Sequence, residues 1–190
     1  MMIEKFLNAK HWQIFLLTFG IPFSFQIVMM VSMIANVFSN KTPDLTFMFN
    51  YMAFIPLILL LFMGIFFGWF WSVAIGLQTK LPEGLNMKVK KFKILFFTPL
   101  VYILFISVII LTSVINGGIN PAFFAIIVPL HLFSMFCMFY TLYFVSKTFK
   151  TVELQRETNF SDFAGEFFML WFFPIGIWIV QPKINKIVET

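Results

Sequence analysis

Four long apolar stretches dominate this chain. Each exceeds twenty residues, and together they cover residues 12–38, 47–77, 94–116 and 121–145. The hydrocarbon core of a bilayer is about 30 Å thick and a helix needs roughly 20 residues to cross it, so each stretch is long enough to span. Their only acidic or basic side chain is one histidine, His131. The sequence therefore predicts an integral membrane protein.

Composition excludes a water-soluble fold. Hydrophobic residues make up 61% of the 190 residues and charged residues 11%, whereas a soluble domain carries about 25% charged residues. We predict an all-α integral membrane bundle of four transmembrane helices, forming a single domain over residues 1–190. The expected spans are about 12–38, 43–77, 94–116 and 121–147. The second begins before its apolar run because Thr42, Pro43 and Asp44 form a helix-start sequence.

Basic residues collect on one side of the expected bundle. Ten of them fall there if four helices cross in alternation, whereas the opposite side receives only Lys41, offset by Asp44. Because retained lysine and arginine mark the cytoplasmic face, we expect the N-terminus in the cytoplasm. Abundant Phe, Ile, Lys and Asn suggest A/T-rich codons, a bacterial source and hence the bacterial inner membrane. The ten residues are Lys5, Lys10, Lys80, Lys88, Lys90, Lys91, Lys93, Lys147, Lys150 and Arg156.

Two polar segments flank the spans on that side. Lys88, Lys90, Lys91 and Lys93 directly precede the third span and are expected to anchor it, with binding to anionic lipid headgroups as the more specific alternative. The net charge of +5 thus indicates a lipid bilayer and not nucleic acid as the partner. Residues 1–10 are typical either of a short interfacial helix or of an ordinary helix end.

Small and polar residues within the spans mark expected packing surfaces. Gly64 and Gly68 form a GxxxG pair, which lets two helices approach backbone to backbone. Packing inside the chain and dimerisation both remain open. Gln26, beside Ser24 in the first span, should face another helix because lipid offers it no partner. Pro22, with Gly20, predicts a kink there.

His131 is the candidate polar site at membrane depth, with Ser134 three residues further on. A titratable group in a span is a functional candidate because its burial is costly. The alternative is a structural histidine whose ring bonds a backbone carbonyl freed by Pro129. Both interpretations stay open at this point.

The C-terminal segment, residues 160–181, is expected to associate with the membrane. Its apolar run is only 14 residues long and holds Pro174, which favours a re-entrant or interfacial helix over a fifth span. Trp171 and Trp178 should then lie in the interfacial layer with Phe173. Glu166 should remain near water.

The same segment resembles a known sequence box. Residues 165–178 read GEFFMLWFFPIGIW, and residues 181–185 read QPKIN. The two runs resemble a C-terminal box of small multi-span membrane proteins of the Bacteroidota. The likeness covers about twenty residues, and it implies the architecture alone, with no activity or cofactor.

Function is predicted mainly by exclusion. The sequence has no HExxH motif, no Cys/His cluster and no pair of carboxylates on one helical face at membrane depth. We therefore predict a non-enzymatic membrane subunit without cofactor or metal, which acts as a homo-oligomer or within a larger membrane complex, possible roles being a pore or an accessory protein. The alternative is a small-molecule or proton-coupled carrier that uses His131. A membrane-embedded enzyme is the weakest of the three.

Overall fold

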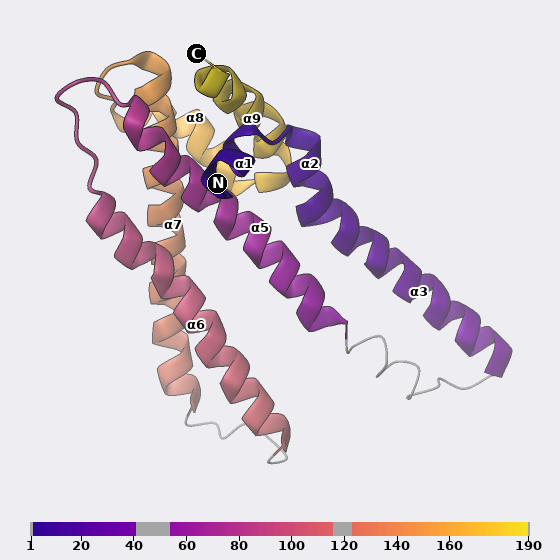
Figure 1. The fold of residues 1–190 in the computed structure, drawn as a ribbon. Helices are drawn as coiled ribbons and strands as arrows, with labels where there is room; N and C mark the ends of the chain where they lie inside the picture. Colours follow the sequence, from indigo (N-terminus) through magenta and orange to yellow (C-terminus); the bar gives the residue numbers. More distant parts are fainter. Residues whose placement is uncertain (1, 41–53, 116–122, 190) are drawn as a thin grey trace. The chain divides into compact units, whose positions relative to one another are not determined.

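The computed structural model describes residues 2–40, 54–115 and 123–189, and these residues form helices joined by short turns, with no strand among them. The all-α prediction is confirmed. Four helical stretches are long and apolar enough to cross a membrane, namely His11–Ser39, Leu57–Lys80, Val89–Ile110 and Phe124–Leu154. The chain is thus a multi-pass membrane protein (Figure 1). It divides into two compact units, Met1–Gly76 with Phe168–Thr190, and Leu77–Phe167.

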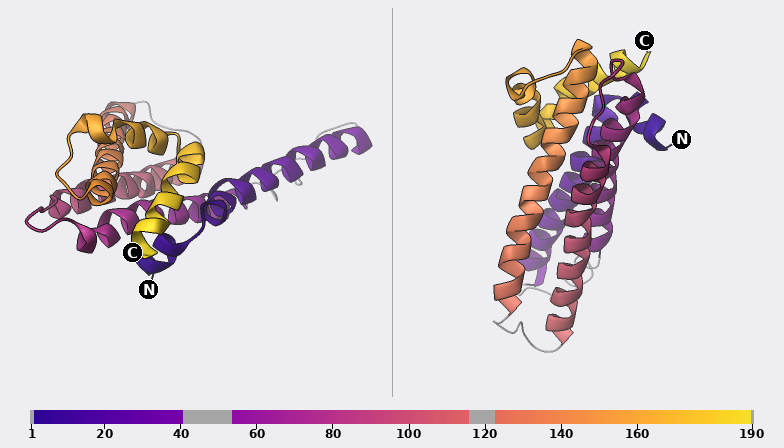
Figure 2. Two further views of the ribbon diagram at one scale, coloured as in Figure 1. Left: turned by 90° about the horizontal axis from the view of Figure 1, so that it is seen from above. Right: turned by 90° about the vertical axis from the view of Figure 1, so that its left-hand side faces the viewer.

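One continuous helical rod forms the first span (Figure 2). It consists of α2 (His11–Phe15), the π-helix η1 (Leu16–Gly20) and α3 (Ile21–Asn40). A proline in a helix lacks an N–H donor and its ring presses on the preceding turn. The π-helix relieves that pressure just before Pro22, because the Ile21 amide bonds the Leu16 carbonyl five residues back. The predicted distortion near Gly20 and Pro22 therefore takes the form of a π-helix.

Apart from Phe168–Trp171, which end another helix, the rest of the described first unit consists of three helices. They are α1 (Met2–Asn8), α5 (Ile55–Gly76) and α9 (Phe173–Glu189). α1 packs on α5 and on α9, so the N-terminal segment is a separate short helix fixed against the chain. The expected helix start at Thr42–Asp44 lies outside the described residues.

The second unit is built on an antiparallel helical pair (Figures 1 and 2). It contains η2 (Leu77–Lys80), α6 (Val89–Ile115), α7 (Phe124–Leu154) and most of α8 (Phe160–Trp171). Phe92 stacks on Phe144 across the pair, with ring centroids 4.5 Å apart. α6 begins five residues before the expected position 94, so Lys90, Lys91 and Lys93 lie in its first turns.

The C-terminal segment forms two helices. α8 ends at Trp171 and α9 begins at Phe173, with Pro174 in its first turn, where a missing N–H costs nothing. The 17 residues of α9 measure about 26 Å at 1.5 Å per residue, short of the hydrocarbon core. α9 is thus shorter than each of the four candidate spans, and the depth of the C-terminal segment in the membrane stays a prediction.

Candidate functional site

A tyrosine–histidine pair lies inside the second unit's helical pair. The hydroxyl oxygen of Tyr102, on α6, is 3.1 Å from Nδ1 of His131, on α7. Tyr102 follows Lys93 by nine residues and His131 follows Phe124 by seven, so the two side chains lie about 13 Å and 10 Å from these span ends. Both lie at hydrocarbon depth if the helices span.

The pair satisfies only part of the histidine. Nδ1 bonds Tyr102, but within the described parts of the chain Nε2 has no hydrogen-bond partner, and the His131 side chain is exposed. An unpaired polar nitrogen in hydrocarbon costs several kcal/mol. The sequence analysis offered a backbone carbonyl freed by Pro129 as the partner of a structural histidine. The partner of Nδ1 is instead the Tyr102 hydroxyl. One of the two ring nitrogens of His131 thus has a partner in the described chain.

The first half of α7 is exposed on most of its sides, and the stripe of residues that runs through His131 has the spacing of a helix-packing seam. Phe124, Val128, His131 and Met135 follow one another at intervals of four, three and four residues, and all four side chains are exposed. This alternation keeps one side of a helix turned toward a neighbouring helix. We call these four residues the α7 seam.

The other two members of the predicted polar site lie elsewhere. Ser134 lies one helical turn from His131 on α7 but is buried, and no hydrogen bond joins the two side chains. Gln26 lies on α3, in the first unit, with an exposed side chain. The expectation that Gln26 faces another helix finds no support in the described chain.

A shallow groove of about 440 Å³ borders Tyr102. Its only other polar residue is Thr98, and the Thr98 hydroxyl donates to the Ile94 carbonyl at 3.0 Å. His131 does not line this groove. A proton or ion path needs a series of polar groups, and this groove does not supply one.

The two glycines of the GxxxG pair have different surroundings. A Cβ at Gly68 would lie 2.9 Å from the Phe6 ring of α1, whereas a Cβ at Gly64 would meet nothing within 4 Å. A Cβ at Gly76 would likewise clash with the side chains of Leu7 and Ile3 of α1. Gly68 therefore packs within the chain, but against the short N-terminal helix and not against a span. Gly64 is left open.

The predicted lysine anchor flanks the start of α6. Lys88 precedes the helix and Lys90, Lys91 and Lys93 occupy its first turns, all with exposed side chains. Cations at a helix N-terminus oppose its dipole, so local helix stability does not explain them. The Lys91 ammonium lies 4.9 Å from the Tyr140 ring centroid, a cation–π contact. Contact with lipid headgroups stays a prediction.

The aromatic residues of the C-terminal segment separate into two groups. Trp171 and Trp178 are about half exposed, at 50% and 46%, as interfacial residues should be. Phe173 is buried, with its ring centroid 4.9 Å from that of Phe66 and 5.3 Å from that of Trp69. The interfacial assignment of Phe173 is therefore wrong, because three aromatic rings of α5 enclose it.

The prediction that Glu166 remains near water is also wrong. Its side chain is only 9% exposed, and its carboxylate lies 3.0 Å from the ammonium group of Lys150. The carboxylate of Glu153 lies 2.6 Å from that ammonium group. A partner sixteen residues away compensates the burial of the carboxylate. Glu166 is thus an ion-paired residue of the second unit and not a water-facing one.

A buried polar cluster that the sequence analysis did not predict joins α1, α5 and α9. Trp69 Nε1 donates to Gln181 Oε1 at 2.6 Å, and Gln181 Nε2 lies 2.7 Å from the Ala9 carbonyl and 3.1 Å from that of Phe6. Asn185 Nδ2 adds a bond of 2.7 Å to the Leu7 carbonyl. We call this set of contacts the amide clamp.

The amide clamp completes the end of α1. The last carbonyls of a helix have no donor within it, and Gln181 and Asn185, one helical turn apart on α9, supply donors from outside. The only signal in the sequence was the pair of amides four residues apart in the QPKIN run.

The link between α7 and α8 carries an exposed ion pair. Arg156 lies 2.8 Å from Asp162. The guanidinium lowers the pKa of the Asp162 carboxyl below its ordinary value, and a hydrogen bond from the Asn159 amide adds to the effect. Asn159 occupies the position just before α8 and Asp162 is the third helical residue, so the bond from the Asn159 amide to the Asp162 carboxylate is one of the two bonds of a capping box.

Within residues 2–40, 54–115 and 123–189, no three His, Cys, Asp or Glu side chains lie close enough together to hold a metal ion. No protein-family model, curated protein or solved structure matches the chain. The resemblance of the C-terminal box to Bacteroidota membrane proteins therefore stays a prediction.

Proposed function

We propose that the protein is a non-enzymatic membrane subunit that works by lateral association with a second copy of itself along the α7 seam. The observation that carries the proposal is the exposed, half-paired His131 at membrane depth. A polar nitrogen facing lipid is costly, and a neighbouring helix can satisfy it. The 4-3-4 spacing of the seam suits such a neighbour.

The chemistry of the pair is self-complementary. If the Tyr102 hydroxyl donates to Nδ1, then neutral His131 carries its proton on Nε2 and needs an acceptor. The Tyr102 oxygen still has a free lone pair. A two-fold pair of copies, the commonest protein symmetry, can therefore satisfy both histidines with both tyrosines.

Cysteine crosslinking tests the seam. Met135→Cys, one turn from His131 on the same face, should give disulfide-linked dimers in membranes when Cys137→Ser removes the native thiol. Phe136→Cys is the matched control, because Phe136 is also exposed, at 61%, but points about 140° away from His131. Adding His131→Phe should lower the crosslinked fraction several-fold. Equal crosslinking at both positions, or none at Met135→Cys, would refute the proposal.

The carrier alternative has its own outcome. Proton or solute flux into proteoliposomes that is lost with His131→Phe, while the Met135→Cys protein stays monomeric, would favour a carrier over a self-associating subunit. The apolar lining of the groove beside Tyr102 speaks against this result.

We also infer a cytoplasmic N-terminus in a bacterial inner membrane, supported by the one-sided lysines of the sequence. A cysteine at Glu189, again with Cys137→Ser, should resist an impermeant maleimide in intact cells and react once the membrane is opened. Labelling of intact cells would place the end of α9 outside and reject the combination of a cytoplasmic N-terminus with a returning C-terminal segment.

A further inference from the structure

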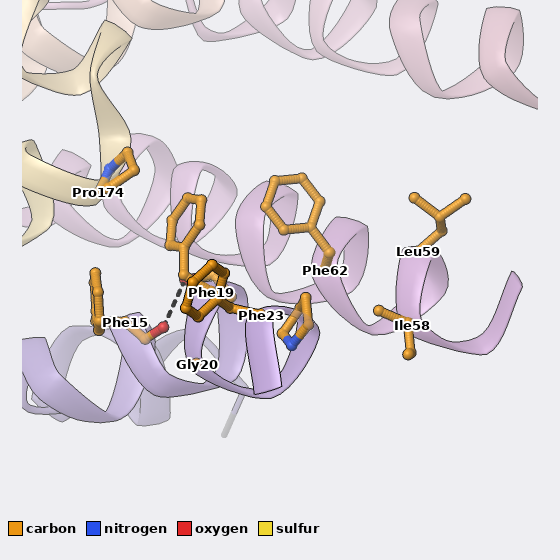
Figure 3. Close-up of a pocket in the computed structure, with 10 residues that line it drawn as sticks. Phe15, Phe19, Gly20, Phe23, Ile58, Leu59, Phe62 and Pro174 are labelled. Carbon is orange, nitrogen blue, oxygen red and sulfur yellow. Dashed lines mark hydrogen bonds between the residues drawn. The ribbon is translucent and has the colours of Figure 1, made fainter. Parts of the chain in front are cut away.

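An apolar groove lies beside the π-helix of the first unit (Figure 3). The α2–η1–α3 rod forms one wall, α5 the other, and Pro174 of α9 lies at one end. Its volume of about 620 Å³ falls within the usual range of small-molecule pockets, about 300–1,000 Å³.

The local backbone explains why a groove is present here. η1 widens the helix over Leu16–Gly20, and Gly20 presents no side chain to the groove. Phe19 of η1 meets Phe62 of α5 edge to face, with ring centroids 5.8 Å apart. The two walls are thereby held together by aromatic rings, with space left beside them.

The lining admits only an apolar occupant. Thr18 is its single polar side chain, and the Thr18 hydroxyl already donates to the Ile14 carbonyl at 2.7 Å. Water needs at least two polar partners in such a site. Since both walls belong to helices that can span the membrane, a hydrocarbon chain is the fitting occupant.

One end of the groove leads to a polar, basic region. His11, Phe15 and Phe19 follow at intervals of four residues along one helical face. Trp178 of α9 packs on His11 and on Phe15, at centroid distances of 4.6 Å and 5.5 Å. No described residue bonds the imidazole nitrogens of His11, and exposed Lys10 precedes it.

Charge favours an anionic headgroup at this end. The charged residues described in the first unit are four lysines and two glutamates. Tryptophan beside such cations is typical of the depth of lipid headgroups. We propose that the groove binds an acyl chain of an anionic phospholipid, with its phosphate beside His11 and Lys10. This site is separate from the α7 seam and does not depend on self-association.

Native mass spectrometry tests the proposal directly. Detergent-purified protein is equilibrated with equal amounts of phosphatidylglycerol and phosphatidylcholine, and bound lipid is identified by mass. The wild type should retain one phospholipid, mainly phosphatidylglycerol. Leu59→Trp, which fills the groove from α5, should lower retention about tenfold, a loss of about 1.4 kcal/mol.

The chain offers a matched control. Leu60 is the adjacent residue, is also exposed, at 71%, and does not line the groove, so Leu60→Trp should retain lipid as the wild type does. Lys10→Gln should keep a bound phospholipid but lose the preference for phosphatidylglycerol. Helical content by circular dichroism checks that each variant is folded.

Three results would overturn the proposal. They are a wild type that carries no lipid, equal loss in Leu59→Trp and Leu60→Trp, and equal retention of the two headgroups by the wild type. A disulfide between copies at Leu59→Cys, in the Cys137→Ser background, would show that another protein chain and not a lipid covers the groove.

Discussion

The amide clamp and the His131 pair are both polar sites in an apolar chain, yet they are completed in opposite ways. Gln181 is fully buried, and both ends of its amide have partners on α1 and α5. His131 is exposed and has one partner for two ring nitrogens. A closed polar site contributes to folding, whereas an open one is available to something outside the chain. The two should therefore respond differently to mutation.

The largest effect is expected at Gln181. Gln181→Leu leaves the buried Trp69 N–H and the carbonyls at the end of α1 without partners, so it should lower the free energy of unfolding by about 3 kcal/mol. The measurement is thermal unfolding in detergent. His131→Phe serves as the comparison, and a stability loss as large as that of Gln181→Leu would show that the two sites do not differ.

Glycine substitutions on α5 come next in size. Gly68→Leu must displace the Phe6 ring and with it α1, which should cost about 1–3 kcal/mol. Gly64→Leu has open space and should be neutral or slightly stabilising in the monomer. Chemical unfolding of the two variants measures the difference in their stability. If Gly64→Leu proved the more damaging in unfolding, the assignment of Gly68 to the packed surface would be wrong.

A smaller effect is expected at Tyr102. Hydrogen bonds between membrane helices contribute on average about 0.6 kcal/mol, so Tyr102→Phe should change monomer stability by about this amount. The crosslinked fraction of Met135→Cys should fall more clearly, because the partner copy loses its acceptor. A large stability loss with unchanged crosslinking would make Tyr102 part of the folded core alone.

The smallest effect concerns the exposed Arg156–Asp162 pair. The pKa of Asp162 is lowered in the folded state, so its contribution to stability is present above the ordinary carboxyl pKa and is lost as pH falls through the lowered value. Unfolding of the wild type compared with Asp162→Asn between pH 6 and about pH 3 measures it. The difference in unfolding free energy between the two proteins should shrink on acidification. A difference that stays constant with pH would show that it does not arise from the carboxylate charge.

The spans could be predicted from the sequence because they depend on local apolar composition. The four stretches recur as helices whose described ends lie within seven residues of the predicted ones, as at α6, where lysines join the first turns. The predicted start of the second span lies outside the described residues. The separate N-terminal helix was one of two open alternatives, and its packing on α5 was not foreseen.

The polar sites were harder to predict because their partners are distant in the chain. His131 was found as a lone polar residue at membrane depth, but not its bond to Tyr102, 29 residues earlier. Gln181 bonds Trp69 across 112 residues. Glu166 was expected near water since nothing in the local sequence indicates Lys150 as its partner. Pairing between distant polar groups leaves no periodic signal.

The amide clamp also has a consequence for biosynthesis. α1 has seven residues, too few to be a stable helix alone, and its stabilising amides belong to α9, near the other end of the chain. A ribosome delivers α1 first and α9 more than 160 residues later. α1 therefore obtains these hydrogen bonds only after α9 has been made, and a nascent chain stalled before Gln181 would present the end of α1 without them to the chaperones and proteases of the cell.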